Sequence, residues 1–335
     1  MDWTLVIVVL LIVIALGFDF TNGFHDAANA IATSVGTKAL KMRTALIMAA
    51  VLNFVGAFLG QEVAKTIQSV VDPGTGPDAF ALVGAALAGA IIWNLITWRF
   101  GMPSSSSHAL IGAVVGSALV VASDVNWSTV WNKVIIPMVT SPFVGLILAF
   151  LLMRVIYLIW RNQDRAATDR GFRRAQVVSA AAMSLGHGLQ DAQKTMGVIA
   201  LVLIAAGYRD EGSEAIPLWV VALCAGAISL GTAFGGQRIM RTLGRRVIDL
   251  SPERGFAAES VASSVLYVAA YGIQAPVSTT QVITGSILGA GAEKSVKAVR
   301  WNVGVNILWA WVLTLPMAAI VAAGVHVLLL ALIGY

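Results

Sequence analysis

Apolar stretches of about twenty residues or more recur along almost the whole chain, separated by short polar breaks. An α-helix needs about 20 apolar residues to cross the hydrocarbon core of a bilayer. Because the backbone in lipid has no water to bind, a spanning segment must be helical or belong to a closed β-barrel. Barrel strands alternate polar and apolar residues over about ten positions, and these stretches do not. The chain is therefore predicted to be an all-α polytopic membrane protein.

Composition excludes the main alternatives to a membrane protein. Of the 335 residues, 12% are charged and 58% are hydrophobic, whereas about 25% of an ordinary soluble domain is charged. Such a chain cannot cover a soluble domain with charge, and it is too apolar to be disordered. The net charge of +5 is expected from basic cytoplasmic loops rather than from nucleic-acid binding. The single cysteine, Cys224, excludes an internal disulfide and argues against a cysteine-based metal site.

The polar breaks fall into a basic set and an acidic set. Lys and Arg are enriched in the cytoplasmic loops of membrane proteins, so the basic breaks are expected in the cytoplasm and the acidic ones outside. The largest basic break, 161–174, is expected to be a cytoplasmic loop. Further basic breaks lie near 38–43, 238–254 and 294–300, and acidic ones lie near 72–78, 124 and 210–214.

Between these breaks the chain is expected to hold ten membrane segments. The first apolar run has no basic residue before it and is expected to be a retained span rather than a cleaved signal. Gly and polar residues interrupt the first and sixth segments, which are therefore expected to be broken or re-entrant, bringing the helix number nearer twelve. The segments lie near 4–36, 44–71, 79–99, 104–121, 129–159, 175–207, 216–236, 255–271, 276–291 and 301–333.

The two halves of the chain share four short motifs, in the same order and 165 to 176 positions apart. Each half holds an odd number of segments, which inverts the second half relative to the first. Inverted repeats with broken helices at matching positions are typical of secondary transporters, whose site lies at the repeat interface near mid-membrane. The expected division is a first repeat over 1–160, the loop 161–174 and a second repeat over 175–335. The matched motifs are Gly23–Ala27 with Gly188–Ala192, Gly60–Ile67 with Gly236–Leu243, Pro103–Ser107 with Pro276–Thr280, and Trp131–Asn132 with Trp301–Asn302.

Asp26 and Asp191 lie inside apolar segments at matching positions of the two halves. A charge at the bilayer centre costs about 2.5–3.5 kcal/mol on insertion scales, so retaining one in each half indicates a use. Carboxylates with nearby amides and free carbonyls are hard oxygen ligands that suit Na⁺ or H⁺. The predicted coupling-cation residues are Asp26, Asn22, Asn29, Asp191 and Gln190.

Structural roles are the alternative for the acids within the membrane. Asp191 lies three residues before Lys194 on the same helix face and could merely pair with it. That pairing does not explain Asp26, because Asn29 stands where Lys194 stands in the second half. Asp19 has no clear counterpart in the second half, and a structural role suits it as well as a functional one.

The motifs Pro103–Ser107 and Pro276–Thr280 each begin with Pro, present clustered hydroxyls and return to apolar sequence. Pro fits the first turn of a helix, so each motif is expected at a helix N-terminus, where free N–H groups and a partial positive charge favour an anion. Ordinary N-capping is the alternative, although one cap needs only one hydroxyl. Arg is absent from the central part of each segment, and Lys194 is the one basic residue placed to assist. The predicted anion-binding residues are Ser105, Ser106, Ser107, Ser278, Thr279, Thr280 and Lys194.

Other functions are compatible with parts of this pattern. Ser184, His187 and Asp191 could suggest a hydrolytic triad, but they lie along one short segment and a triad must converge on one point. An intramembrane aspartyl protease would use paired aspartates and leave the hydroxyl motifs unexplained. A passive anion channel would need no coupling cation. His25 and His108 could relay protons, with packing or capping as an equal alternative.

At these motifs the chain resembles the inorganic phosphate transporter (PiT) family. The family signature is close to Gly-x-Asn-Asp-x-x-Asn in the first half and His-Gly-x-Asn-Asp-x-Gln-Lys in the second. Here these read Gly23-Phe-His-Asp26-Ala-Ala-Asn29 and His187-Gly-Leu-Gln-Asp191-Ala-Gln193-Lys194, and the family's Pro-x-Ser-Thr-Thr boxes appear as the two hydroxyl motifs. His25 and Gln190 stand where the signature usually has Asn. His25 resembles bacterial members regarded as proton-coupled or metal–phosphate carriers.

The resemblance implies uptake of inorganic phosphate by symport with Na⁺ or H⁺, through alternating access, in a bacterial-type inner membrane. Sulfate or another oxyanion is an alternative substrate, since related members carry sulfate. No enzyme activity, catalytic residue or cofactor is expected, and no metal beyond the coupling cation, unless a divalent metal travels with the phosphate. The expected partners are phosphate and membrane lipid, a homodimer is compatible with the family, and no nucleic acid is expected.

Overall fold

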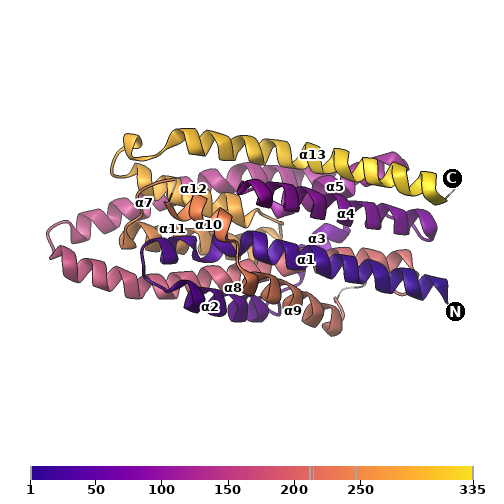
Figure 1. Ribbon diagram of the computed structural model, residues 1–335, viewed down its shortest axis with the longest axis horizontal. Coiled ribbons are helices and arrows are strands. Elements are labelled where there is room, and N and C mark those ends of the chain that lie inside the picture. Colours follow the sequence, from indigo (N-terminus) through magenta and orange to yellow (C-terminus); the bar gives the residue numbers. More distant parts are fainter. Residues whose placement is uncertain (1, 211–212, 214, 246, 334–335) are drawn as a thin grey trace.

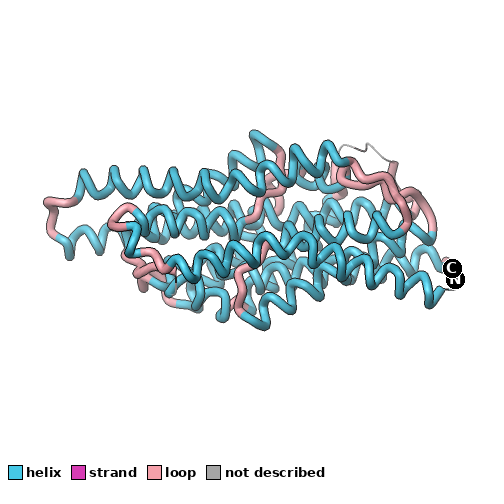
Figure 2. The backbone as a smooth tube through the Cα atoms, turned by 90° about the horizontal axis from the view of Figure 1, so that it is seen from above, coloured by secondary structure: helices cyan, strands magenta, loops and turns pink. Residues whose placement is uncertain are grey.

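The computed structural model describes residues 2–210, 213, 215–245 and 247–333, which form helices joined by loops (Figure 1, Figure 2). Among these residues, the β-type contact is an isolated antiparallel bridge between Val71 and Val125. The first half contains α1 (Trp3–Gly36), α2 (Met42–Gly56), α3 (Glu62–Gln68), α4 (Pro77–Phe100), α5 (Ser106–Val120), the short α6 (Trp127–Thr129), a π-helical turn (Val130–Ile135) and α7 (Ile136–Trp160). The second half contains α8 (Arg165–Ala205), α9 (Leu218–Phe234), α10 (Gln237–Arg245), α11 (Pro252–Tyr267), a π-helical turn (Val268–Ile273), α12 (Thr279–Ala292), a 3₁₀ turn (Val296–Ala298) and α13 (Trp301–Ile333).

Several helices are suited to a bilayer. Within the described residues, five helical stretches are long and apolar enough to cross a membrane. Large apolar side chains are exposed along the outer helices, for example Phe143 and Leu151 on α7 and Trp309 and Leu328 on α13. Apolar surface of this extent is stable in lipid but not in water. The predicted fold class, an all-α polytopic membrane protein, is confirmed. The five stretches are Trp3–Gly36, Pro77–Phe100, Trp127–Trp160, Pro252–Ile273 and Trp301–Leu332.

The first and sixth segments are continuous helices, and the breaks that we expected in them are absent. α1 runs unbroken through Asp26, and α8 runs unbroken through Asp191. The glycines that suggested breaks lie where helices approach closely. A Cβ atom on Gly23 would overlap a backbone oxygen of α9, and one on Gly188 would overlap a backbone oxygen of α2. In both helices, Gly and polar residues mark a packed interface rather than an opening of the backbone.

The basic segment 161–174 is a loop only over 161–164. Asp164 caps α8 by accepting a 2.8 Å hydrogen bond from the backbone N–H of Ala167. The remainder of the expected loop forms the first turns of α8, which begins at Arg165. The expected segment 44–71 is likewise divided, into α2 and α3.

The chain reverses direction inside the molecule in two helical hairpins. α4 packs against α5, and α11 packs against α12. The chain reverses at turns that contain left-handed residues, Gly101 with φ 65° and Gln274 with φ 58°. The two turns meet inside the molecule, where the Ser107 hydroxyl donates a 3.2 Å hydrogen bond to the carbonyl of Val277. Each hairpin thus joins a membrane-length helical stretch, α4 or α11 with its π-helical turn, to a shorter helix, α5 or α12.

Helices of the first half pack against helices of the second half in a crossed pattern, α1 against α9 and α2 against α8. Gly23 of α1 faces the backbone of α9 and Gly231 of α9 faces that of α1, while Gly56 of α2 and Gly188 of α8 face one another's helices in the same way. Small residues at such positions let helix backbones approach closely. α1 and α8 run in opposite directions along the long axis of the molecule (Figure 1). The crossed pattern supports the expectation of two repeats with opposite orientation. It recurs between α5 and α13, where Gly112 meets Leu315, and between α12 and α7, where Gly285 meets Pro142.

Charged loops gather at the two ends of the helix bundle. At the basic end, a pocket of about 490 Å³ is lined by basic residues that include Arg154, Arg165 and Lys294. At the acidic end, a pocket of about 590 Å³ lies beside Asp72 and Asp124. Breaks of like charge, far apart in the sequence, thus come together in space.

Candidate functional site

One face of α1 carries a row of polar side chains. Asp19, Asn22, Asp26, Asn29 and Thr33 are spaced alternately three and four residues apart, which places them on one side of the helix. Each is at most 1% exposed. α8 packs against this helix with buried polar residues of its own, and the turns of both hairpins close on the pair.

Asp26 contacts groups from both halves of the chain. Its carboxylate lies 2.6 Å from Nδ1 of His25 and accepts a 2.8 Å hydrogen bond from the hydroxyl of Ser106, at the start of α5. The hydroxyl of Thr280, at the start of α12, donates to it over 3.4 Å, and Asn29 donates to that hydroxyl over 2.8 Å. In the described structure, Asp26 therefore lies between two helix N-termini and is surrounded by hydroxyls and an imidazole.

Asp191 has a different set of partners. Lys194 forms an ion pair with Oδ1 of this carboxylate, so the pairing weighed as an alternative is present. Oδ2 lies 3.0 Å from Nε2 of His187 and accepts a 3.4 Å hydrogen bond from the hydroxyl of Thr279. Nδ1 of His187 in turn lies 3.2 Å from the side-chain oxygen of Asn53. The ion pair with Lys194 therefore accounts for only part of the surroundings of Asp191.

The two aspartates and one histidine converge on a single point. One ligand atom each from Asp26, His187 and Asp191 lies within 4.8 Å of the others. Nearby, Oδ1 of Asn29 and Oε1 of Gln190 are buried and have no hydrogen-bond partner among the described residues. Two carboxylates with a single lysine leave an excess negative charge when the histidines are neutral. This set of hard oxygen donors fits a cation.

The hydroxyl motifs serve two purposes. Ser105 caps α5 and Ser278 caps α12, each accepting a hydrogen bond from a backbone N–H three residues on, over 3.2 Å and 3.3 Å. Ser106, Thr279 and Thr280 instead donate to the carboxylates. Ordinary capping thus uses one hydroxyl of each motif. The N-termini of α5 and α12 therefore lie beside the aspartates, with these three hydroxyls turned towards the carboxylates.

We call the group formed by Asp26, Asn29, Ser106, His187, Asp191, Lys194, Thr279 and Thr280 the central site. Three residues singled out from the sequence lie beside it with other contacts. The Ser107 hydroxyl is bonded to a backbone carbonyl of the opposite hairpin. Nδ1 of His108 lies 3.3 Å from the side-chain nitrogen of Gln281. Both ends of the Asn22 amide are buried and have no hydrogen-bond partner in the described structure.

Two hydroxyls that we did not single out hold His25 in place. Nε2 of His25 lies 3.3 Å from the hydroxyl of Thr97 and 3.3 Å from that of Ser104, and these hydroxyls are joined by a 2.8 Å hydrogen bond. Ser104 belongs to the first hydroxyl motif, so its position was a usable signal. Thr97 is a single hydroxyl in an apolar helix, and nothing in its local sequence marks it.

A second buried carboxylate cluster lies on α11, and we did not predict it from the sequence. Glu259 is fully buried and accepts hydrogen bonds from the hydroxyls of Thr33 on α1 and Ser179 on α8, the latter over 2.6 Å. An acidic residue five positions into an expected membrane segment was a signal that we passed over. Thr33 lies seven residues beyond Asp26, so this cluster is nearer the basic end.

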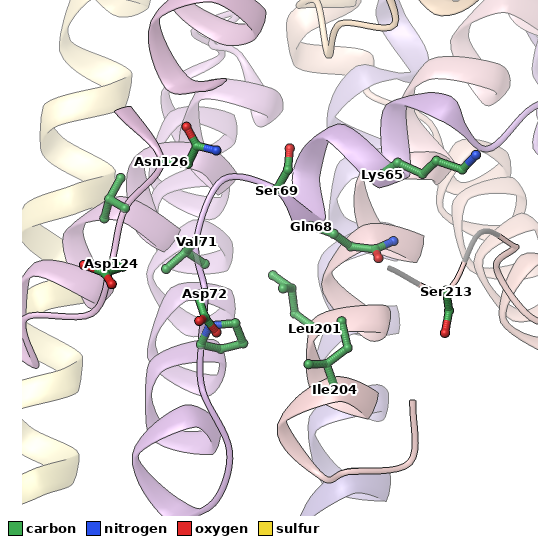
Figure 3. Close-up of a pocket in the computed structure, with 12 residues that line it drawn as sticks. Lys65, Gln68, Ser69, Val71, Asp72, Asp124, Asn126, Leu201, Ile204 and Ser213 are labelled. Carbon is green, nitrogen blue, oxygen red and sulfur yellow. The ribbon is translucent and has the colours of Figure 1, made fainter. Parts of the chain in front are cut away.

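The central site is sealed, since each of its side chains is at most 2% exposed. The acidic-end pocket approaches it along α8 and is lined by Leu201 and Ile204, beside the residues of α3 (Figure 3). Leu201 lies seven residues, or two turns, beyond Lys194 on the same helix face. Between them, Ile67 of α3 packs against Gly197. α3 therefore separates the pocket from the central site.

Comparison with known proteins gives a consistent result. Residues 22–322 match the sequence model of a family described as the phosphate transporter family. The chain is 46% identical to a probable low-affinity inorganic phosphate transporter of Bacillus subtilis, over 96% of this chain and 97% of that protein. It is 47% identical to a protein of the same description from Rhizobium meliloti, over 96% and 97% of the two chains.

More distant similarity extends over the same length. A putative phosphate permease of Pyrococcus furiosus is 30% identical over 97% of both chains. Among solved structures, one described as the sodium-dependent phosphate transporter superposes with a TM-score of 0.86 at 25% identity, covering 97% of this chain and 99% of that one.

Proposed function

We propose, from the premise that this chain belongs to the phosphate transporter family, that it imports inorganic phosphate by symport with a cation. The observation that carries the proposal is the convergence of both aspartates and both hydroxyl-bearing helix N-termini on one sealed site. The helix ends suit an oxyanion, and the carboxylates suit a cation. A site with both requirements binds the two ligands together.

Phosphate would lie between the starts of α5 and α12. There the free backbone N–H groups and the hydroxyls of Ser106, Thr279 and Thr280 can turn from the carboxylates to the phosphate oxygens. Lys194, already at the site, would offer its remaining N–H groups. Ser105 and Ser278 are engaged as helix caps, so this assignment gives them a supporting role.

Charge explains why a cation is needed. Bringing phosphate next to two carboxylates is unfavourable in a site shielded from water, where unit charges interact more strongly than in solution. A cation held by Asp26, Asn29, Asp191 and Gln190 would offset that repulsion, and its departure would weaken phosphate binding. The solved relative is described as sodium-dependent, whereas the contact between His25 and Asp26 suits a proton. We therefore propose cation coupling, and uptake measured under separate Na⁺ and pH gradients distinguishes Na⁺ from H⁺.

The fold suggests how access alternates. We propose that the two halves are inverted repeats and that the basic end faces the cytoplasm. Opening at α3 would join the central site to the acidic-end pocket (Figure 3). Opening at the opposite end would release the ligands inside. The sealed arrangement described here is an occluded state of such a cycle.

Radiolabelled phosphate uptake into liposomes that contain the purified protein tests this function. A Na⁺ gradient and a pH gradient are imposed separately, and accumulation above equilibrium under either one is expected. Counterflow against preloaded phosphate separates a carrier from a channel. Competition by unlabelled sulfate measures anion preference. Uptake that equilibrates passively under both gradients would contradict the proposal.

A further inference from the structure

Besides Asp26, α1 carries a second buried acidic residue, which lies on the acidic-end side of the central site. Asp19 is fully buried and precedes Asp26 by seven residues on the same helix face. Two helical turns place it about 10 Å further along the helix, at a rise of about 1.5 Å per residue. Neither the cation nor the phosphate assignment of the central site uses this carboxylate.

The polar atoms around Asp19 lack partners. Both carboxylate oxygens of Asp19, both ends of the Asn22 amide and the hydroxyl of Thr195 are buried without a hydrogen-bond partner among the described residues. Thr195 lies on α8 and faces Asp19 closely enough for the two side chains to interact. Asn22 lies three residues along α1 from Asp19, at a spacing that makes side chains neighbours on a helix surface. Buried polar groups are almost always satisfied, so this cluster calls for a ligand.

The neighbouring helices do not neutralise Asp19. Lys194 acts on Asp19 only weakly, and its ammonium group is bonded to Asp191. α9 contributes the thiol of Cys224, which is buried and uncharged when protonated. α4 also packs against α1, and both ends of its buried Asn94 amide are without a partner among the described residues.

We propose that Asp19, Asn22 and Thr195 form an outer Na⁺ site, separate from the central site. The carboxylate, amide and hydroxyl oxygens are the hard ligands that such a cation takes. A proton would satisfy one oxygen of Asp19 and leave the amide of Asn22 unpartnered. Ca²⁺ prefers six to eight oxygens, usually from several carboxylates, and this site has one carboxylate.

The position of the outer Na⁺ site along α1 suggests its role in transport. It lies between the central site and the acidic end, so an entering Na⁺ would meet Asp19 before Asp26. It raises the number of cations bound per protomer by one. The existence of the site does not depend on the proposed function, whereas its place in a transport cycle does.

Equilibrium binding of ²²Na⁺ to the purified full-length protein in detergent tests the site. Asp19→Asn is expected to remove one bound Na⁺ per protomer. Thr195→Val should weaken the affinity for that same Na⁺ by about tenfold, because it removes one of the oxygen ligands. Thr195→Ser keeps the hydroxyl and should stay within about threefold of wild type. Retained binding of phosphate shows that the variants are folded.

Three outcomes overturn the site. In the first, the Asp19→Asn variant binds as much Na⁺ as the wild-type protein. In the second, Asp26→Asn by itself removes all Na⁺ binding. In the third, the wild-type protein binds no Na⁺, and only Asp19→Asn changes the release of protons on phosphate binding. The last result would assign a proton to Asp19. Failure of the proposed function is distinct, because then liposomes show no coupled phosphate uptake while Asp19→Asn still removes one Na⁺.

Discussion

Asp26 and Asp191 occupy matching positions in the two halves, yet they are surrounded differently. Lys194 forms an ion pair with Asp191, and the equivalent position in the first half is Asn29, which is bonded to a hydroxyl instead. One carboxylate is therefore paired with a lysine, while the other contacts an imidazole and hydroxyls. The two matching motifs place their carboxylates alike, and the residue three positions further on gives each carboxylate a different setting. Under the proposed function, Asp26 would chiefly couple the cation, while Asp191 would both help to hold the cation and position Lys194 for the anion.

The largest expected difference between the two halves is in stability. Asp191→Asn leaves Lys194 buried without its carboxylate, and breaking a buried ion pair in this way costs about 3–5 kcal/mol. Asp26→Asn leaves no buried lysine behind, so its cost should stay near that of a hydrogen bond, about 1 kcal/mol. Thermal unfolding of the two purified variants in detergent measures this. Equal losses would mean that Asp191 is not the charge partner of Lys194.

Transport should respond most strongly to Asp26. Asp26→Asn is expected to lower cation-driven phosphate uptake by up to about 100-fold, because coupling between two ligands is worth about 1–3 kcal/mol. Phosphate binding at saturating cation should change less than uptake does. The exposed Asp78, at the start of α4, gives the matched control, and Asp78→Asn should transport as wild type does. Full accumulation by Asp26→Asn would remove it from the cation site.

The hydroxyls allow a finer comparison between anion binding and capping. Ser106→Ala and Thr279→Ala should each weaken phosphate affinity by about tenfold, since a hydrogen bond to a charged group contributes about 1.5–3 kcal/mol. Ser105→Ala and Ser278→Ala remove caps, so they should instead lower stability by about 0.5–2 kcal/mol and leave affinity within about threefold. Phosphate titration of the purified variants distinguishes the pairs. The reverse pattern would place the anion on the capping hydroxyls.

The smallest effect is expected at His25, whose equivalent in the second half is Gln190. The imidazole contacts Asp26 directly, so it is placed to exchange a proton with that carboxylate. His25→Asn should keep phosphate affinity within about threefold but flatten the dependence of uptake on pH between about 5.5 and 8. Uptake measured across that range at constant Na⁺ provides the test. An unchanged pH profile would exclude His25 from proton handling.

The parts of the site that repeat are the parts that can be predicted from the sequence. Asp26, Asp191 and the two hydroxyl motifs recur at nearly constant spacing, and this recurrence is enough to pair them. The continuity of α1 and α8 could not be foreseen, because Gly beside polar residues is equally compatible with a broken helix and with a close-packed interface. The contacts of Thr97 and Glu259 depend on how helices are rotated against one another. Local sequence does not specify that rotation.

The central claim is that cation and phosphate bind together because each offsets the charge of the other in one site. The most direct measurement is phosphate affinity of the purified protein with and without saturating cation, paired with cation affinity with and without saturating phosphate. Linkage requires both ratios to be equal, and a factor between about 5 and 150 is expected. Asp26→Asn should bring both ratios to one. Phosphate affinity that is independent of Na⁺ and of pH in the wild-type protein would contradict the account.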